Sequence, residues 1–258
     1  AHKADELRYM LLMKELDNFN TNRIDDVIDS LLARQVDGIV WVAPEIGDNH
    51  TWVEERMNKI PVPVLFLAMQ PRNGISSVAT DNYNGAVLAI QHLLDCGRKN
   101  IGHISGPLSW WEADERKRGW HEMLSTAGFI TSENRCAEGN WSSSSGEQAF
   151  IQLLESFPEM DGVFVANDQM ALSVLREAYR RGIRVPEELA VIGFDNIPES
   201  AYFHPSLTTI AQDLQLLGEQ AVQNIVEMIQ ARQENRPSTA RSIFIQPTLV
   251  IRESTVQV

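Results

Sequence analysis

The fold is decided by the stretch Gly162-Val163-Phe164-Val165-Ala166-Asn167-Asp168-Gln169-Met170-Ala171-Leu172, which runs on to Arg181. It opens with a short apolar run typical of a buried strand, and the pair Asn167-Asp168 is a good N-cap for a following helix. Another apolar run stands at residues 190–194. A strand, a helix and a second strand in this order predict a parallel sheet with helices on its faces.

The same alternation continues on both sides of this stretch. Strands are expected at residues 7–12, 38–42, 64–67, 77–80 and 101–105. Helices are expected at residues 23–34, 52–58, 82–96 and about 214–230, and residues 1–5 are expected to form the last turn of another helix. One small sheet cannot hold so many units, so the sequence predicts an α/β protein of two doubly wound parallel-sheet subdomains.

The two expected subdomains each take two segments of the chain. We place the N-terminal subdomain at residues 1–80 plus 212–245 and the C-terminal subdomain at residues 81–211 plus 246–258. Because no Pro-rich or low-complexity linker separates them, several short crossings are expected to join the two. The cleft between them is then the default place for a binding site.

The composition is that of a folded protein without a membrane span. The chain has 258 residues, of which 43% are hydrophobic and 22% charged, and no apolar run approaches the roughly 18 residues of a membrane helix. The formal charge of −13 has the wrong sign for neutralising phosphates, so this stretch alone is not expected to bind DNA. Cys96 and Cys136 are too few for a disulfide scaffold and suit a reducing compartment.

The common catalytic and cofactor-binding signatures are missing from the sequence. It contains no G-x-S-x-G, H-E-x-x-H, C-x-x-C, P-loop or G-x-G-x-x-G motif, and its histidines show no metal-ligand spacing. The run Gly102-His103-Ile104-Ser105-Gly106 resembles a nucleophile elbow only loosely, since its serine sits one position late. We therefore expect neither an enzyme nor a metal or cofactor site.

Several blocks of sequence resemble the effector-binding core of the lactose repressor (LacI/GalR) family of bacterial transcription regulators. They stand at residues 34–39, 92–101, 106–109, 116–120, 165–172, 191–196, 205–210 and 212–213. The block at residues 191–196 reads Val191-Ile192-Gly193-Phe194-Asp195-Asn196. The likeness to the repressor for which the family is named is especially close at residues 138–142, 166–172 and 214–218.

The resemblance implies a type I periplasmic-binding-protein-like fold, a cytoplasmic homodimer and a sugar effector, with a galactoside or related sugar as the first guess. It also implies a helix-turn-helix headpiece that binds operator DNA, which this chain does not contain. The family's first core strand and most of its first helix should precede Ala1, so we expect at least one further strand–helix unit upstream, on the order of 20 to 30 residues. No membrane partner is implied.

The positions that match the family's effector site supply the groups that a sugar needs. Arg116 can give paired N–H donors to adjacent hydroxyls, Asp195 can accept from two hydroxyls, and Asn167 can do both. Trp141 would stack on the apolar face of the sugar. Gln212, at a crossing between the subdomains, could touch both ligand and hinge.

Each of these assignments has a purely structural alternative. Arg116 could be a solvated charge within a charged run, and Asn167 could serve only as a helix N-cap. Asp195 could cap its own loop, Trp141 could pack in the core, and Gln212 could be a turn residue. The residues alone leave these alternatives open.

Two departures from the family pattern bear on which sugar is bound. Ala68 stands where the nearest relatives carry a pocket aspartate. Trp110, Trp111 and Glu112 stand where smaller side chains are usual, and could narrow the pocket or replace the missing acceptor. Trp111 and Glu112 are therefore further candidates for effector binding.

Two rival functions remain beside a sugar-responsive repressor core. A periplasmic sugar-binding protein of a transporter would share the fold but would need an export signal, and residues 205–213 resemble the regulators more than the exported proteins. A sugar-processing enzyme is disfavoured because no acid, base or nucleophile constellation stands out.

Overall fold

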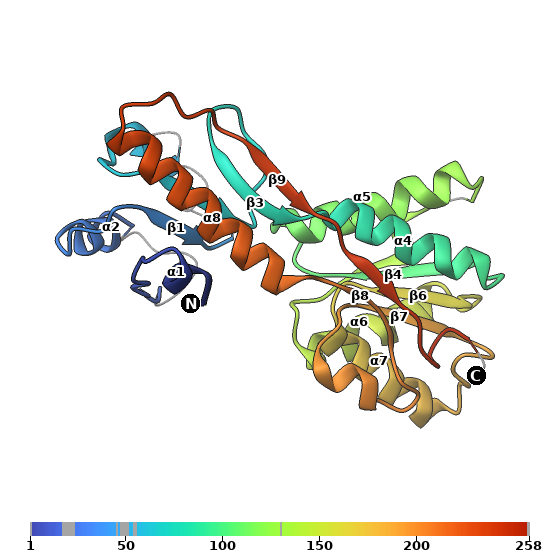
Figure 1. Cartoon of the computed structure of the whole chain (residues 1–258). Helices are drawn as coiled ribbons and strands as arrows, with labels where there is room; N and C mark the ends of the chain where they lie inside the picture. Colours follow the sequence, from blue (N-terminus) through green and yellow to red (C-terminus); the bar gives the residue numbers. More distant parts are fainter. Residues whose placement is uncertain are drawn as a thin grey trace. The chain divides into compact units, whose positions relative to one another are not determined.

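The computed structural model describes residues 2–16, 24–44, 46, 52–53, 56–129 and 131–256 (Figure 1). Ala1 and Arg23, at the ends of two expected helices, and residues 54–55 of the expected helix at 52–58 lie outside these ranges. The contacts divide the chain into two compact units. The first comprises Ala1–Thr80 and Asp213–Ile245, and the second comprises Asp81–Gln212 and Gln246–Val258.

The first unit is built on a four-stranded parallel sheet in the order β1-β2-β3-β9. Its strands are β1 (Ile39–Val42), β2 (Val64–Leu67), β3 (Ser76–Thr80) and β9 (Ser242–Ile245). Its helices are α1 (His2–Glu6), α2 (Ile24–Leu32), the 3-10 turn η1 (Met57–Lys59) and α8 (Leu214–Gln233). The chain therefore returns to this unit after completing most of the second.

Neighbouring residues of β2 point to opposite faces of this sheet, which gives the unit two cores. Phe66 packs with Trp41 and with Ile28 of α2, whereas Leu65 packs with the apolar side chains of α8. Alternation of side chains along a strand explains the division. Helix α8 packs very close to this sheet. A Cβ added to Gly38, which directly precedes β1, would stand 3.0 Å from Ile225 of α8.

The expected strand at residues 7–12 is wrong. The chain turns after α1 and then has no regular structure, and the side chains of Met10 and Met13 are 94% and 83% exposed. A strand requires a neighbour that satisfies its backbone N–H and C=O groups, and none of the strands described in this sheet pairs with the segment. An apolar run alone did not provide that neighbour.

The second unit is built on a six-stranded sheet in the order β10-β8-β7-β6-β4-β5. Its strands are β4 (Ile101–Ser105), β5 (Cys136–Glu138), β6 (Gly162–Val165), β7 (Ala190–Asp195), β8 (Thr208–Ala211) and β10 (Thr248–Val250). The strands pair in parallel except for β10, which runs antiparallel to β8 at the edge. The sequence had indicated parallel strands only.

Two pairs of helices cover the faces of this second sheet (Figure 1). The helices are α4 (Asn82–Asp95), α5 (Trp111–Thr126), α6 (Ser143–Ser156) and α7 (Asp168–Arg181), with 3-10 turns η2 (Glu133–Arg135) and η3 (Pro198–Tyr202). Phe164 packs against the α4 and α5 side with Trp120, and its neighbour Val165 packs against the α6 and α7 side with Phe150. Parallel strands with helices on both faces make this unit doubly wound, as the sequence predicted.

One boundary residue differs from the expected subdomains. Gln212 was placed at the start of the second segment of the N-terminal subdomain, whereas its contacts make it part of the second unit. Its side chain bonds to Asp195 of β7, in the same unit.

Among the described helices, none is both long enough and apolar enough to cross a membrane.

Candidate functional site

The carboxyl ends of the parallel strands in the second unit bring the predicted site residues to one edge of its sheet. β4 is followed by the segment that leads to Trp110, β5 by the turn at Trp141, and β6 by Asn167. β7 ends at Asp195 itself, and β8 is followed by Gln212. Ligands bind at this edge in doubly wound sheets, so the topology gathers these residues without their being close in sequence.

Arg116, on α5, is buried at the centre of this edge, with 5% of its surface exposed. Its Nε donates to Oδ1 of Asn82 at 2.8 Å, and its Nη1 donates to the carbonyl oxygen of Ala166. The guanidinium carbon lies 3.6 Å from the centroid of the Phe194 ring. Burial lowers the pKa of Arg116, and the carboxylate of Asp195 opposes that effect. The alternative of a solvated charge is therefore wrong, although two of its nitrogens are already engaged.

Asp195 lies next to Arg116, with Oδ1 3.9 Å from Nη1 of the arginine. The same Oδ1 accepts a hydrogen bond from Nε2 of Gln212 at 2.6 Å. Its side chain is 30% exposed, and burial raises its pKa while Arg116 lowers it. The backbone is left-handed at Asp195 and at Asn196, with φ of 113° and 57°. Such conformations are costly for residues other than glycine and often mark functional sites.

Asn167 caps α7, as the sequence predicted. Its Oδ1 accepts from the backbone N–H of Met170 at 3.0 Å, which satisfies one of the unpaired donors at the helix start. Its Nδ2 donates to the carbonyl oxygen of Trp141 at 3.0 Å. The side chain thus connects the loop after β6 to the loop after β5.

Trp141 forms part of an aromatic wall at the same edge. Its ring lies over Gly106, where a Cβ would stand 2.2 Å from the ring, so only glycine leaves room for it. Trp110 contacts the Trp141 ring edge to face, with centroids 5.7 Å apart. The guanidinium carbon of Arg116 lies 5.7 Å from the centroid of the Trp141 ring. Trp141 also packs against the core around α6 and α7. The core-packing alternative is therefore correct for part of its surface.

Trp111 and Glu112 begin α5, on the same helix as Arg116. Both are half-buried, and the carboxylate of Glu112 raises the pKa of Arg116. Trp110 occupies the N-cap position of this helix without capping it through a side-chain hydrogen bond. The unusual residues therefore lie at the same edge of the second unit as Arg116 and Trp141. Ala68 belongs to the first unit, where it follows β2 with φ of 56°.

Sequence reasoning missed two residues of this site. Asn82 holds the Nε of Arg116, and Asp168 is a fully buried carboxylate beside the loop that follows β7. The sequence did show Asp168 in the capping pair that starts α7, but nothing in the pattern indicated what its side chain contacts. Within the described ranges, no group of three His, Cys, Asp or Glu side chains could hold a metal ion.

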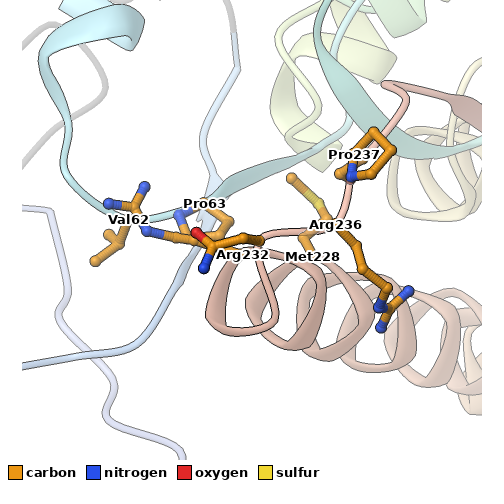
Figure 2. A pocket seen from close by; sticks show the side chains of 8 residues that line it. Val62, Pro63, Met228, Arg232, Arg236 and Pro237 are labelled. Carbon is orange, nitrogen blue, oxygen red and sulfur yellow. The ribbon is translucent and has the colours of Figure 1, made fainter.

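A separate cavity of about 630 Å³ lies in the first unit, where α8 ends (Figure 2). It is lined by Val62, Pro63, Met228, Arg232, Asn235, Arg236, Pro237 and Ser238. In Figure 2, Met228 and Arg232 come from α8, whereas Val62 and Pro63 come from the segment before β2. None of the predicted site residues lines it.

In a comparison with known protein families, residues 90–255 match the family described as a periplasmic-binding-protein-like domain. The chain is 31% identical to the lactose operon repressor of Escherichia coli K12, over 89% of this chain and 63% of the relative. It is 33% identical to catabolite control protein A of Priestia megaterium, over 85% of this chain and 65% of the relative. The chain thus spans less than two thirds of the length of these two curated relatives.

Solved structures show the same similarity. The lac repressor dimer bound to operator and the anti-inducer ONPF matches with a TM-score of 0.86 at 30% identity, over 99% of this chain and 86% of that one. The transcriptional regulator CelR in complex with cellobiose matches with a TM-score of 0.87 at 26% identity, over 98% of this chain and 76% of that one. Both folds therefore resemble nearly the whole of this chain.

Proposed function

Because this chain belongs to the LacI family of transcription regulators and carries their periplasmic-binding-protein-like domain, we propose that it is the effector-sensing core of a transcriptional repressor. The effector is a small sugar, with galactosides as the first candidates. The chain acts as a homodimer in the cytoplasm, and operator DNA is bound by a helix-turn-helix headpiece of the whole protein. The match to the lactose operon repressor supports a repressor over a transporter's binding protein or an enzyme.

The observation that carries this proposal is the pairing of Arg116 and Asp195 at the carboxyl edge of the second sheet. A buried guanidinium and a partly exposed carboxylate stand 3.9 Å apart, between Nη1 of Arg116 and Oδ1 of Asp195, and the same Oδ1 accepts a hydrogen bond from Gln212. A sugar hydroxyl can donate to such a carboxylate and accept from such a guanidinium. Two adjacent hydroxyls match a donor and an acceptor held this close together.

The aromatic wall supports the same class of ligand. Sugars present patches of C–H groups as well as hydroxyls, and indole rings pack well against such patches. Trp141 and Trp110 lie beside Arg116, so polar and apolar contacts are offered at one place. The names of two matched structures, which contain cellobiose and the anti-inducer ONPF, also favour a small organic effector over a macromolecule.

Regulation by such an effector is conformational. A ligand changes the balance between two states only through its different affinities for them. The two states would differ in the spacing of two headpieces that read half-sites about one helical turn apart. The formal charge of −13 fits this division of labour, because the sensing core itself has no need to contact phosphates.

Calorimetric titration tests the proposal. The chain is titrated with galactosides, glucosides, cellobiose and pentoses, and the sugars that bind are repeated with Asp195→Ala. Loss of a charged partner for a sugar hydroxyl costs roughly 1–3 kcal/mol, so affinity should fall on the order of tenfold. Asp95→Ala is the control, because Asp95 is exposed at the opposite end of α4 from Asn82 and accepts a hydrogen bond from Gln91 on its own helix.

Two results would contradict the proposal. Binding of no sugar in the panel would reject a sugar effector, and equal affinity in Asp195→Ala and the unaltered chain would remove Asp195 from the site. A gel-shift assay with a full-length relative's headpiece fused before this chain then tests whether the bound sugar changes operator affinity.

A further inference from the structure

Asp168, the first residue of α7, is a buried carboxylate that the proposed function does not use. It is fully buried and accepts two hydrogen bonds from other parts of the sheet. Its Oδ1 accepts from the hydroxyl of Thr209, on β8, at 2.6 Å. Its Oδ2 accepts from the backbone N–H of Ile197, after β7, at 2.9 Å. One carboxylate therefore links the start of α7 to β8 and to the turn that follows β7.

The bond to Ile197 closes a strained turn. Asp195 and Asn196, which precede Ile197, are both left-handed, with φ of 113° and 57°. Such a pair persists only where surrounding contacts hold it. Asp168 provides one of these contacts, and Arg252 provides another, since its Nη2 donates to Oδ1 of Asn196 at 2.7 Å.

The neighbouring backbone is adapted to this carboxylate. A Cβ on Gly193 would lie 2.3 Å from Oδ1 of Asp168, so any side chain at position 193 would displace it. The pKa of Asp168 is raised to about 6, chiefly by burial and also by the charge of Asp195, against the lowering effect of the hydrogen bonds from Thr209 and Ile197 and of the charge on Arg252. The third charged group nearby is Arg116, whose pKa Asp168 raises. Keeping a buried carboxylate ionised at neutral pH is costly, so a role for its two oxygens is expected.

We infer that Asp168 is a positioning residue, which holds the turn at residues 195–197 so that Asp195 is presented to the effector. The inference rests on the proposed function for the identity of that ligand. Asp168 itself does not touch the effector. Removing its carboxylate loosens the turn and weakens effector binding, although Arg116, Asn167 and Asp195 are all retained.

Amide hydrogen exchange tests the positioning role without any ligand. Exchange at the Ile197 N–H is compared in the unaltered chain, in Asp168→Asn, which keeps one acceptor, and in Asp168→Ala, which keeps none. Exchange should quicken in that order, on the order of tenfold for loss of the bond. The matched control is Asp161→Ala, because Asp161 accepts from the amides of Lys99 and Asn100 at the other end of β6. It should quicken exchange at those amides and leave Ile197 unchanged.

Sugar titration of the same variants tests the consequence. Affinity for whichever sugar binds the unaltered chain should fall about tenfold in Asp168→Ala and less in Asp168→Asn, and should be unchanged in Asp161→Ala. Thr209→Val should weaken binding, whereas Thr209→Ser, which restores the hydroxyl, should rescue it. A merely structural contact would not show this rescue in affinity at equal stability.

The outcomes separate the two proposals. Unchanged Ile197 exchange in Asp168→Ala, or unchanged affinity in a folded Asp168→Ala, overturns the positioning role. Where Asp168→Ala does not fold, Asp168→Asn decides in the same way. A panel in which no sugar binds the unaltered chain contradicts the proposed function, while the exchange measurement still decides whether Asp168 holds the turn.

Discussion

The guanidinium carbon of Arg116 lies 3.6 Å from the centroid of the Phe194 ring, and Phe194 is the residue before Asp195. One strand end therefore supplies both an apolar surface beneath the cation and the carboxylate beside it. An arginine suits this place because its planar group stacks on a ring and still donates from its edge. The fixed orientation of Arg116 is thus a property of β7 as much as of α5.

Replacing Arg116 by lysine should weaken both stability and effector binding. An ammonium group cannot reproduce the bonds to Asn82 and Ala166 together, and it packs less well on Phe194. We expect a loss of about 1–3 kcal/mol in the free energy of unfolding, measured by urea denaturation. Arg118→Lys is the control, because Arg118 lies on the same helix, is exposed and pairs with Glu115. Equal effects in both variants would contradict the role of Arg116.

Replacing Gly106 by alanine should displace the Trp141 ring. A Cβ there would stand 2.2 Å from that ring, a distance that no relaxation of the methyl group removes. Sugar affinity should fall, and the tryptophan fluorescence of the ligand-free protein should change. Gly218→Ala is the matched control. Beyond its chain neighbours and the adjoining backbone of α8, no atom of the described residues lies within 4 Å of a Cβ built there, so the alanine should stabilise α8 by about 0.5–1 kcal/mol without altering sugar binding.

The stability contributed by Asp168 should depend on pH with a definite sign. Its pKa in the folded protein is raised to about 6 from 3.8. As the pH falls, the folded state therefore binds a proton at a higher pH than the unfolded state does. Relative to Asp168→Asn, the unaltered chain should gain stability as the pH falls from 7 to 4, by about 3 kcal/mol at most. Denaturation curves of both proteins at several pH values measure the difference. A difference that does not change with pH would contradict the raised pKa.

The stability contributed by His103 should change with pH in the opposite direction to that contributed by Asp168. It is fully buried on β4, its Nδ1 lies 2.9 Å from the carbonyl oxygen of Phe164, and burial lowers its pKa to about 3. The unfolded chain therefore binds a proton that the folded chain excludes, and stability is lost as the pH falls from about 6.5 towards 3. His103→Phe would keep ring packing between Trp120 and Phe164 and should remove this loss. The same denaturation series measures it, and an unchanged acid loss would reject the assignment.

The pH-dependent effects of the Asp168 carboxyl and of the His103 imidazole can be separated by combining the two variants in one protein. Asp168 and His103 lie on different elements and share no hydrogen-bond partner. Their pH-dependent contributions should therefore add in the double variant. Departure from additivity would indicate that the sheet relaxes as one unit when either group titrates.

Local pattern was sufficient for some of the site and insufficient for the rest. The cap formed by Asn167 could be predicted because it depends on residues within one helical turn. The strand expected at residues 7–12 failed because strand formation depends on a neighbour, which hydrophobicity does not reveal. The burial of Arg116 could not be read from its charged surroundings in sequence, since Phe194 of β7 and Ala166, which directly follows β6, lie far from it in the sequence.

By itself, the sequence determined that this chain alternates strands and helices, and that its polar groups follow the ends of apolar runs, because both depend on short-range periodicity and capping. The pairing of Arg116 with Asp195 and the hydrogen bond from Ile197, between β7 and η3, to Asp168 became visible only in the three-dimensional fold. Those relationships depend on which strand ends become neighbours in the sheet. Strand order follows from packing of the whole unit and is not written in any single stretch of residues.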